Sequence, residues 1–214
     1  MMKGSAQKSE LETLKRLYRK KRSAIRERLS EFSSVPTSEY FYELAYCLLT
    51  PQSSAVHADR AVETLRSHLF SEQGGNPEQL LRNPAHYIRF HRTKARHLLL
   101  ARAGFPAVLQ ALSNGRPAGE VREWLVKNVK GLGYKEATHF LRNIGKNNGL
   151  AILDRHILRN LKRYGSIRSV PKALTRRKYL AIEQRFKAFS QQIGIPPDEL
   201  DLLFWSTETG EIRK

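Results

Sequence analysis

The sequence predicts an all-α protein, and two observations lead to this prediction. Apolar residues recur at three- and four-residue steps along most of the chain, which is the spacing of an amphipathic helix. No segment shows the apolar–polar alternation of a half-buried strand. The chain has 214 residues, of which 40% are hydrophobic, so it can form one large domain or two small lobes with cores of their own.

The first expected helix is long and amphipathic. Ser9 and Glu12 have the spacing of a capping box, which predicts that the helix starts at Ser9. The segment Val35-Pro36-Thr37 is expected to break the chain after it. One face of this helix carries its apolar residues, which are Leu11, Leu14, Tyr18, Ile25, Leu29 and Phe32.

Further helices are expected along the first two thirds of the chain. Their predicted ranges are about 38–49, 54–69, 94–103 and, after Pro106, 107–112. Asn76-Pro77 and Asn83-Pro84 each have the pattern of an N-cap followed by proline at the first helical position. Another helix carries Val121, Trp124 and Leu125, and residues 71–76 are the clearest loop.

The charge balance favours a polyanionic partner. Lys and Arg total 38 against 20 Asp and Glu, which gives a formal net charge of +18. Such an excess attracts nucleic acid above all; the alternative is a solvated basic surface, as in a thermophilic or ribosome-associated protein. No signal peptide or membrane-spanning run is visible, so we expect a soluble, cytoplasmic protein.

A single cysteine excludes an internal disulfide framework and a four-cysteine metal or iron–sulfur site. Cys47 lies in an apolar run and is expected to be a buried thiol. We see no metal-ligand cluster and expect no cofactor, although a monovalent cation could bind carbonyl groups of the hairpin described next.

The segment from Val129 to Ala137 has the pattern of a tight hairpin between two helices. Gly131 and Gly133 flank Leu132, which suits a turn that needs positive φ and close backbone approach. Leu132 would anchor the turn to the core. The N–H groups at the start of the next helix would point outward, where a phosphate can bind. An ordinary helix connection is the alternative.

Lys135 falls in the first turn of the helix that follows the hairpin. It lies off the apolar stripe of that helix, and the positive helix end and the neighbouring cations Lys127 and Lys130 disfavour an ammonium there. An amine nucleophile requires such surroundings. The alternative is a solvated lysine that contacts phosphate. The apolar stripe consists of Ala137, Phe140, Leu141 and Ile144.

Asp154 ends the apolar run 149–153 and precedes a helix with one apolar face. An ordinary N-cap explains an aspartate at this position. A capping aspartate is also rigidly held and ionised, so it could stabilise positive charge on a sugar or orient Lys135. The two roles are compatible. The apolar face of the helix consists of Ile157, Leu158, Leu161 and Tyr164.

These segments together resemble a known family. Gly131-Leu132-Gly133-Tyr134-Lys135, followed by Leu153-Asp154-Arg155-His156, resembles the helix-hairpin-helix DNA glycosylases. Three further strings make the chain similar to the second, archaeal-type family of 8-oxoguanine DNA glycosylase/AP lyases. They are residues 49–53, 89–95 and 140–145. The resemblance covers the chain from about residue 36 to its end.

The resemblance implies a base-excision repair enzyme with two helical lobes and an active site in the cleft between them. One lobe would span 36–149 and end in the hairpin, and the other would combine 1–35 with 150–214. The implied activity is that of a bifunctional DNA N-glycosylase and AP lyase. It would remove 8-oxoguanine from duplex DNA through a lysine Schiff base and β-elimination. A monomer acting on double-stranded DNA that contains a damaged base is expected.

The resemblance also implies roles for individual residues. Lys135 would be the nucleophile and Asp154 the essential aspartate, while Gly131 and Gly133 would bind DNA. His156 would contact the DNA backbone. The remaining implied roles are filling of the vacated base stack by Gln52, probing of the opposite base by Arg89 and Phe90, and recognition of the damaged base by Trp205 and Lys214.

The sequence excludes one related class of enzyme and leaves other interpretations open. The chain lacks the C-terminal cysteine cluster of the endonuclease III branch, which argues against an iron–sulfur enzyme. Trp205 could equally pack in the core, because it follows Leu202, Leu203 and Phe204. The competing functions are a glycosylase for another oxidised base, a non-catalytic helix-hairpin-helix DNA-binding module, and an RNA-binding or ribosomal protein.

Overall fold

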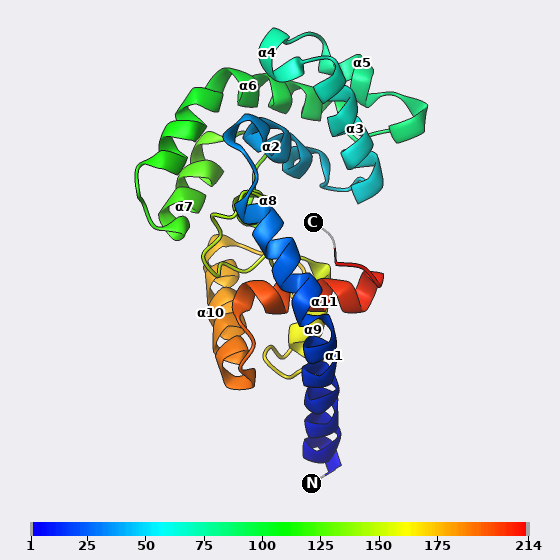
Figure 1. Ribbon diagram of the computed structural model, residues 1–214, viewed down its shortest axis with the longest axis vertical. Helices are drawn as coiled ribbons and strands as arrows, with labels where there is room; N and C mark the ends of the chain where they lie inside the picture. Colours follow the sequence, from blue (N-terminus) through cyan, green and yellow to red (C-terminus); the bar gives the residue numbers. More distant parts are fainter. Residues whose placement is uncertain (1, 213–214) are drawn as a thin grey trace. The chain divides into compact units, whose positions relative to one another are not determined.

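The computed structural model describes residues 2–212, and it confirms the prediction of an all-α protein (Figure 1). Within this range every regular element is a helix and no strand occurs. No helix among the described residues is long and apolar enough to cross a membrane.

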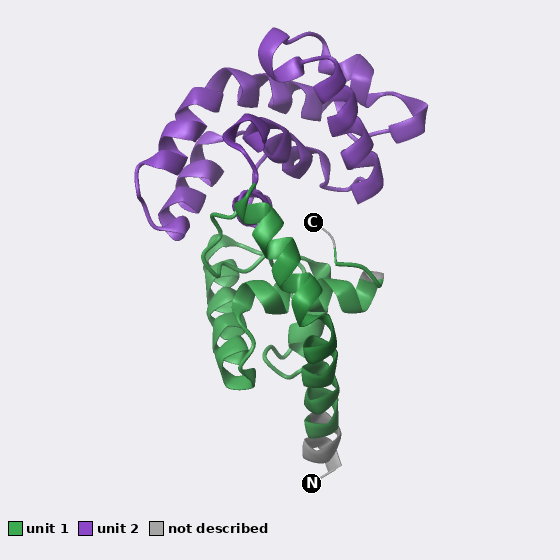
Figure 2. Ribbon diagram, in the orientation of Figure 1, with its two compact units in different colours: residues 1–34, 145–214 green, residues 35–144 purple. Residues whose placement is uncertain are grey.

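The chain divides into two compact units (Figure 2). Residues 35–144 form one, and residues 1–34 together with 145–214 form the other. The boundary after residue 144 lies five positions before the predicted boundary at 149. The reason is that the segment 145–149 is bound to its own unit: the Asn147 side-chain amide donates to Asp198 Oδ1 at 2.6 Å, and the Gly149 N–H donates to Asp198 Oδ2 at 3.2 Å.

The unit of residues 35–144 is built around one apolar helix. This helix, α2 (Tyr40–Leu49), is buried from Phe41 to Leu49 because nearly all of its side chains are apolar. It packs against α3 (Ala55–Ser67), α6 (His91–Ser113) and α8 (Tyr134–Asn143). The remaining elements are η1 (Thr37–Glu39), α4 (Phe70–Gln73), α5 (Pro77–Leu81), η2 (Pro84–His86) and α7 (Ala118–Asn128).

The unit formed by the two ends of the chain is built around its last helix. This helix, α11 (Pro197–Thr209), packs against α1 (Met2–Ser33), α9 (Arg155–Arg163) and α10 (Arg176–Ile193). In its core the ring of Phe204 stacks on that of Tyr164, with centroids 5.7 Å apart. The buried phenol of Tyr18 donates to Glu199 Oε2 at 2.6 Å, which connects α1 to α11.

Two of the predicted helix boundaries are wrong. The first helix begins at Met2, so Ser9 lies inside it, and the Ser9 carbonyl accepts a hydrogen bond from the Thr13 hydroxyl. The predicted break at Pro106 does not occur: α6 is continuous from His91 to Ser113. Its buried residues lie on both sides of the proline, and this packing holds the helix together where the local sequence disfavours it.

The predicted asparagine caps are confirmed. Asn76 Oδ1 accepts the Glu78 N–H at 3.0 Å, and Asn83 Oδ1 accepts the Ala85 N–H at 2.9 Å. The loop predicted at 71–76 is shorter than expected, because α4 extends to Gln73.

Candidate active site

The hairpin turn between α7 and α8 needs a glycine at one of its two glycine positions. Gly131 has φ of +91°, and a Cβ atom there would lie 2.3 Å from Nδ1 of His97. Both the backbone conformation and the close approach of the imidazole therefore exclude a side chain. Leu132 follows and is only 5% exposed, so it anchors the turn to the core.

Gly133 plays a different part from the one expected. Its φ of −92° and ψ of −179° are extended backbone that any residue can adopt, so only Gly131 meets the expectation of positive φ. Gly133 is the N-cap of α8, and no side chain caps this helix end. The N–H groups of its first turn are therefore not bonded to a capping side chain, and they carry the positive end of the helix dipole.

Lys135 lies in the first turn of α8 and is half-buried, with a side chain 27% exposed. Its Nζ is 3.8 Å from Oε1 of Glu136, the next residue in the chain. Sequence reasoning missed this carboxylate. An acidic residue in the first turn of a helix is a common stabilising feature, and Glu136 could have been noticed on that ground.

Two turns of the same unit carry Gln52, Arg89 and Phe90. Gln52 has φ of +57° and Phe90 has φ of +61°, both in the left-handed region that non-glycine residues rarely adopt. Phe90 is 51% exposed, and the Arg89 guanidinium lies over its ring, 4.9 Å from the centroid. The turns are joined directly, because the Arg89 N–H donates to Ser53 Oγ at 3.1 Å.

Asp154 is the N-cap of α9, in agreement with its predicted capping role. Oδ1 accepts the Ile157 N–H at 2.8 Å, and Oδ2 accepts the Trp205 indole N–H at 3.2 Å. The side chain is thus held at both carboxylate oxygens. Two such hydrogen bonds fix the orientation of the carboxylate.

The segment before Asp154 is fixed by side chains of α10. The Ala151 N–H donates to Glu183 Oε1 at 2.9 Å, and the Tyr179 hydroxyl donates to the Ala151 carbonyl at 2.6 Å. The Leu153 N–H donates to the same hydroxyl at 3.3 Å. Buried backbone outside helices and sheets needs such partners, and here they hold the segment that leads to Asp154 in place.

His156 and Trp205 lie next to this aspartate. Their rings meet edge to face, with centroids 6.1 Å apart, and His156 Nδ1 is 3.5 Å from Glu208 Oε2. Trp205 is half-buried rather than part of the core. The structure therefore brings together Asp154, His156 and Trp205 within one unit, and Gln52, Arg89 and Phe90 within the other, which also holds the hairpin and Lys135. Lys214 lies outside the described residues.

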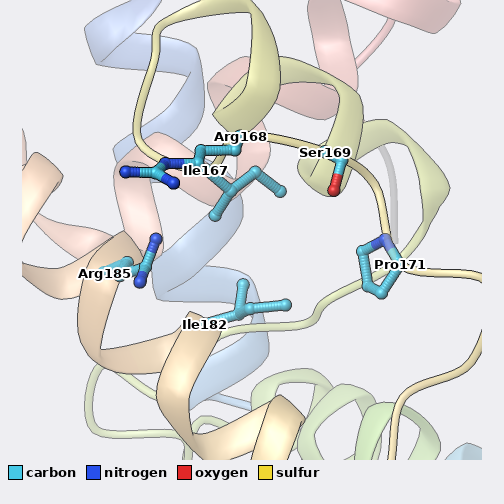
Figure 3. Close-up of a pocket in the computed structure, with 6 residues that line it drawn as sticks. All are labelled: Ile167, Arg168, Ser169, Pro171, Ile182 and Arg185. Carbon is cyan, nitrogen blue, oxygen red and sulfur yellow. The ribbon is translucent and has the colours of Figure 1, made fainter.

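A hollow of ≈ 550 Å³ lies elsewhere in the unit that contains α10 (Figure 3). Arg168 and Arg185 converge on one side of it, and Ile167 and Ile182 form its apolar wall. No residue predicted for the site lines it. Among the described residues, no group of three or more His, Cys, Asp or Glu side chains could hold a metal ion.

Comparison with known proteins identifies the family of this chain. The family model described as 8-oxoguanine DNA glycosylase matches residues 25–195, which include the hairpin, Lys135 and Asp154. An 8-oxoguanine DNA glycosylase/AP lyase of Korarchaeum cryptofilum is 42% identical, over 90% of this chain and 91% of its own length. One of Fusobacterium nucleatum is 38% identical, over 94% of this chain and 96% of its own.

Solved structures agree with the sequence relatives. The 8-oxoguanine glycosylase/lyase of Methanocaldococcus jannaschii, in complex with a 15mer DNA containing 8-oxoguanine, superposes with a TM-score of 0.85 at 33% identity. The match covers 96% of this chain and all of that one. The 8-oxoguanine DNA glycosylase of Thermotoga maritima gives a TM-score of 0.84 at 31% identity, over 97% of this chain and all of its own. The chain therefore belongs to the 8-oxoguanine DNA glycosylase family.

Proposed function

We propose that this protein is a bifunctional DNA glycosylase and AP lyase that removes 8-oxoguanine from duplex DNA. The observation that carries the proposal is the position of Lys135, in the first turn of a helix that begins at the Gly131 hairpin. A monofunctional glycosylase activates water and needs no amine at this place, whereas an amine nucleophile also explains strand cleavage. The names of the relatives support the same activity.

DNA is the proposed partner, in the form of a duplex with one damaged base. The net charge of +18 attracts the phosphate backbone and speeds association. The uncapped start of α8 offers N–H groups to a phosphate. His156 would add a contact to the backbone. We expect the protein to act as a monomer and to work in the cytoplasm, in the compartment that holds the chromosome.

The damaged nucleotide must flip out of the DNA duplex before it can react, because the neighbouring bases shield its anomeric carbon. Gln52 would fill the vacated stack, while Arg89 and Phe90 would contact the base that has lost its partner. The exposed ring of Phe90 suits this task, since apolar side chains that enter a duplex offset the cost of unstacking. Trp205 and Lys214 would recognise the flipped base.

The first chemical step breaks the glycosidic bond. The unprotonated amine of Lys135 attacks C1′, the C1′–N9 bond breaks, and its electron pair leaves with the base, which takes up a proton. Asp154 stabilises the positive charge that develops on the sugar with its carboxylate, which two N–H donors hold in a fixed orientation. The C1′–O4′ bond then breaks, O4′ takes up the proton that the nitrogen loses, and a Schiff base forms between Lys135 and C1′.

The second step nicks the strand. The Schiff base acidifies the protons on C2′; removal of one of them breaks the C3′–O3′ bond, and the 5′-phosphate end of the downstream strand leaves. Water then hydrolyses the unsaturated Schiff base and regenerates Lys135. The proposal therefore predicts a cut on the 3′ side of the lesion.

A strand-cleavage assay on a panel of duplexes tests the proposal. The panel contains 8-oxoguanine opposite cytosine, an oxidised pyrimidine opposite adenine, and undamaged DNA. Lys135→Gln should abolish cleavage, and Lys178→Gln, which removes the same charge from an exposed position in α10, should retain it. If only the duplex with the oxidised pyrimidine is cleaved, the substrate of the enzyme is that lesion and not 8-oxoguanine. Binding by both variants without cleavage of any duplex would favour a non-catalytic module.

A further inference from the structure

Lys94 is buried, whereas lysine side chains usually lie on the protein surface. It lies in the first turn of α6 and is only 6% exposed. Its position falls on the apolar stripe of the helix, in line with Leu98 and Ala101, where an aliphatic residue would be expected. A charged side chain is rarely buried without partners that compensate for lost hydration.

Its ammonium has three such partners, at the end of α2 and in the turn that holds Gln52. Nζ donates to the carbonyl oxygens of Leu49 and Pro51, each at 2.6 Å, and to Ser53 Oγ at 3.1 Å. An ammonium has three donors, so its hydrogen-bonding capacity is filled. Pro51 and Ser53 are the two chain neighbours of Gln52, so Lys94 holds the backbone on both sides of that residue.

The same lysine is connected to the turn of Arg89 and Phe90. Its backbone N–H donates to the Phe90 carbonyl at 3.0 Å, and Ser53 Oγ, which accepts from Nζ, also accepts the Arg89 N–H. Gln52 and Phe90 both have positive φ, and non-glycine residues keep such a conformation only when their surroundings impose it. Lys94 and Ser53 provide these surroundings for both turns.

We propose that Lys94 is a positioning residue that, together with the Ser53 hydroxyl, holds the Gln52 turn and the Arg89–Phe90 turn as one rigid element for entering the DNA duplex. The inference rests on the proposed function, in which these residues act on the stack and on the opposite strand. The role of Lys94 is confined to duplex DNA, because a single-stranded abasic site has no stack to fill and no partner base. On such a single-stranded substrate, the chemistry of Lys135 needs neither turn.

The test compares two single-turnover rates for each variant. One is excision of 8-oxoguanine from a duplex, and the other is cleavage of a single-stranded oligonucleotide with an abasic site. Lys94→Met keeps most of the length of the side chain and removes all three donors, and its ratio of duplex to single-strand rate should fall about tenfold. Ser53→Ala removes one shared acceptor, and we expect its ratio to fall about threefold to fivefold.

Two further variants separate positioning from stability. Ser53→Thr keeps the hydroxyl and should restore the ratio. Ser54→Ala removes the N-cap of α3, which accepts the His57 N–H at 3.1 Å, and should weaken folding without changing the ratio. If Lys94→Met and Ser53→Ala retain the wild-type ratio while the wild type is active, the positioning role is overturned. A wild type that cleaves neither substrate would contradict the proposed function itself.

Discussion

The indole N–H of Trp205 donates a hydrogen bond to Oδ2 of Asp154, over 3.2 Å and across fifty-one positions of the chain. Through this contact Trp205 orients the carboxylate, which is a role distinct from packing in the core or stacking on a base. Trp205→Phe keeps one aromatic ring and removes the N–H donor together with the second ring. We expect excision of 8-oxoguanine to fall about tenfold, as for the loss of a hydrogen bond to a charged group. A Phe variant with wild-type single-turnover rates would reduce Trp205 to stacking.

Substitution of Asp154 separates capping from catalysis. Asn caps a helix about as well as Asp, whereas Ala in place of Asp costs about 1 kcal/mol. Asp154→Asn should therefore lose less stability to urea than Asp154→Ala, while excision falls at least about a hundredfold in both because the negative charge is gone. Asn also places an amide opposite the Trp205 N–H, and the rate of Trp205→Phe measures that part of the loss. Substantial excision by Asp154→Asn would mean that the aspartate is only a cap.

The two glycines of the hairpin should respond differently to alanine. Gly131→Ala places a side chain at φ of +91° and into the ring of His97, so it should cost more than about 1–2 kcal/mol of unfolding free energy. Gly133→Ala has extended backbone and meets only the carboxylate end of the Glu136 side chain, so its cost should stay below about 1 kcal/mol. Urea denaturation of both variants measures the difference. Equal losses would contradict the assigned turn geometry.

Lys94 should make stability depend on pH in the alkaline range. Burial lowers the pKa of Lys94 from its ordinary value of 10.5 to about 8. Between these values the unfolded chain binds the proton and the folded protein does not, so the unfolding free energy rises with pH from about 8 to 10.5. Met does not titrate. The stability of the wild type relative to Lys94→Met should therefore be greater at pH 9.5 than at pH 7 in urea denaturation. A constant or falling difference would contradict the lowered pKa.

Local chemistry was predictable from the sequence because it lies within a few residues. Asn76 and Asn83 cap the helices that follow them, and Asp154 caps α9 through an N–H three positions ahead. The hairpin was recognised for the same reason, although the two glycines look equivalent in the sequence. The positive φ of Gly131 and the approach of His97, thirty-four positions earlier in the chain, distinguish it from Gly133.

Features that depend on distant partners were not predictable. Pro106 looked like a helix break, yet packing on both sides of it keeps α6 continuous. The partners of Lys94 lie more than forty positions away, and its only local sign was a charged residue on an apolar stripe. Likewise, nothing near Asp154 in the sequence indicated that Trp205 would bind its carboxylate. Such contacts arise from tertiary packing and need the structure.

Borohydride trapping tests the central claim, that Lys135 forms a Schiff base with damaged DNA. The wild type is incubated with a duplex that carries one 8-oxoguanine opposite cytosine, and the reduced adduct is digested and located by mass spectrometry. We predict a covalent adduct on the peptide that contains Lys135, absent in Lys135→Gln and present in Lys178→Gln. An adduct on another lysine, or its survival in Lys135→Gln, would contradict the account.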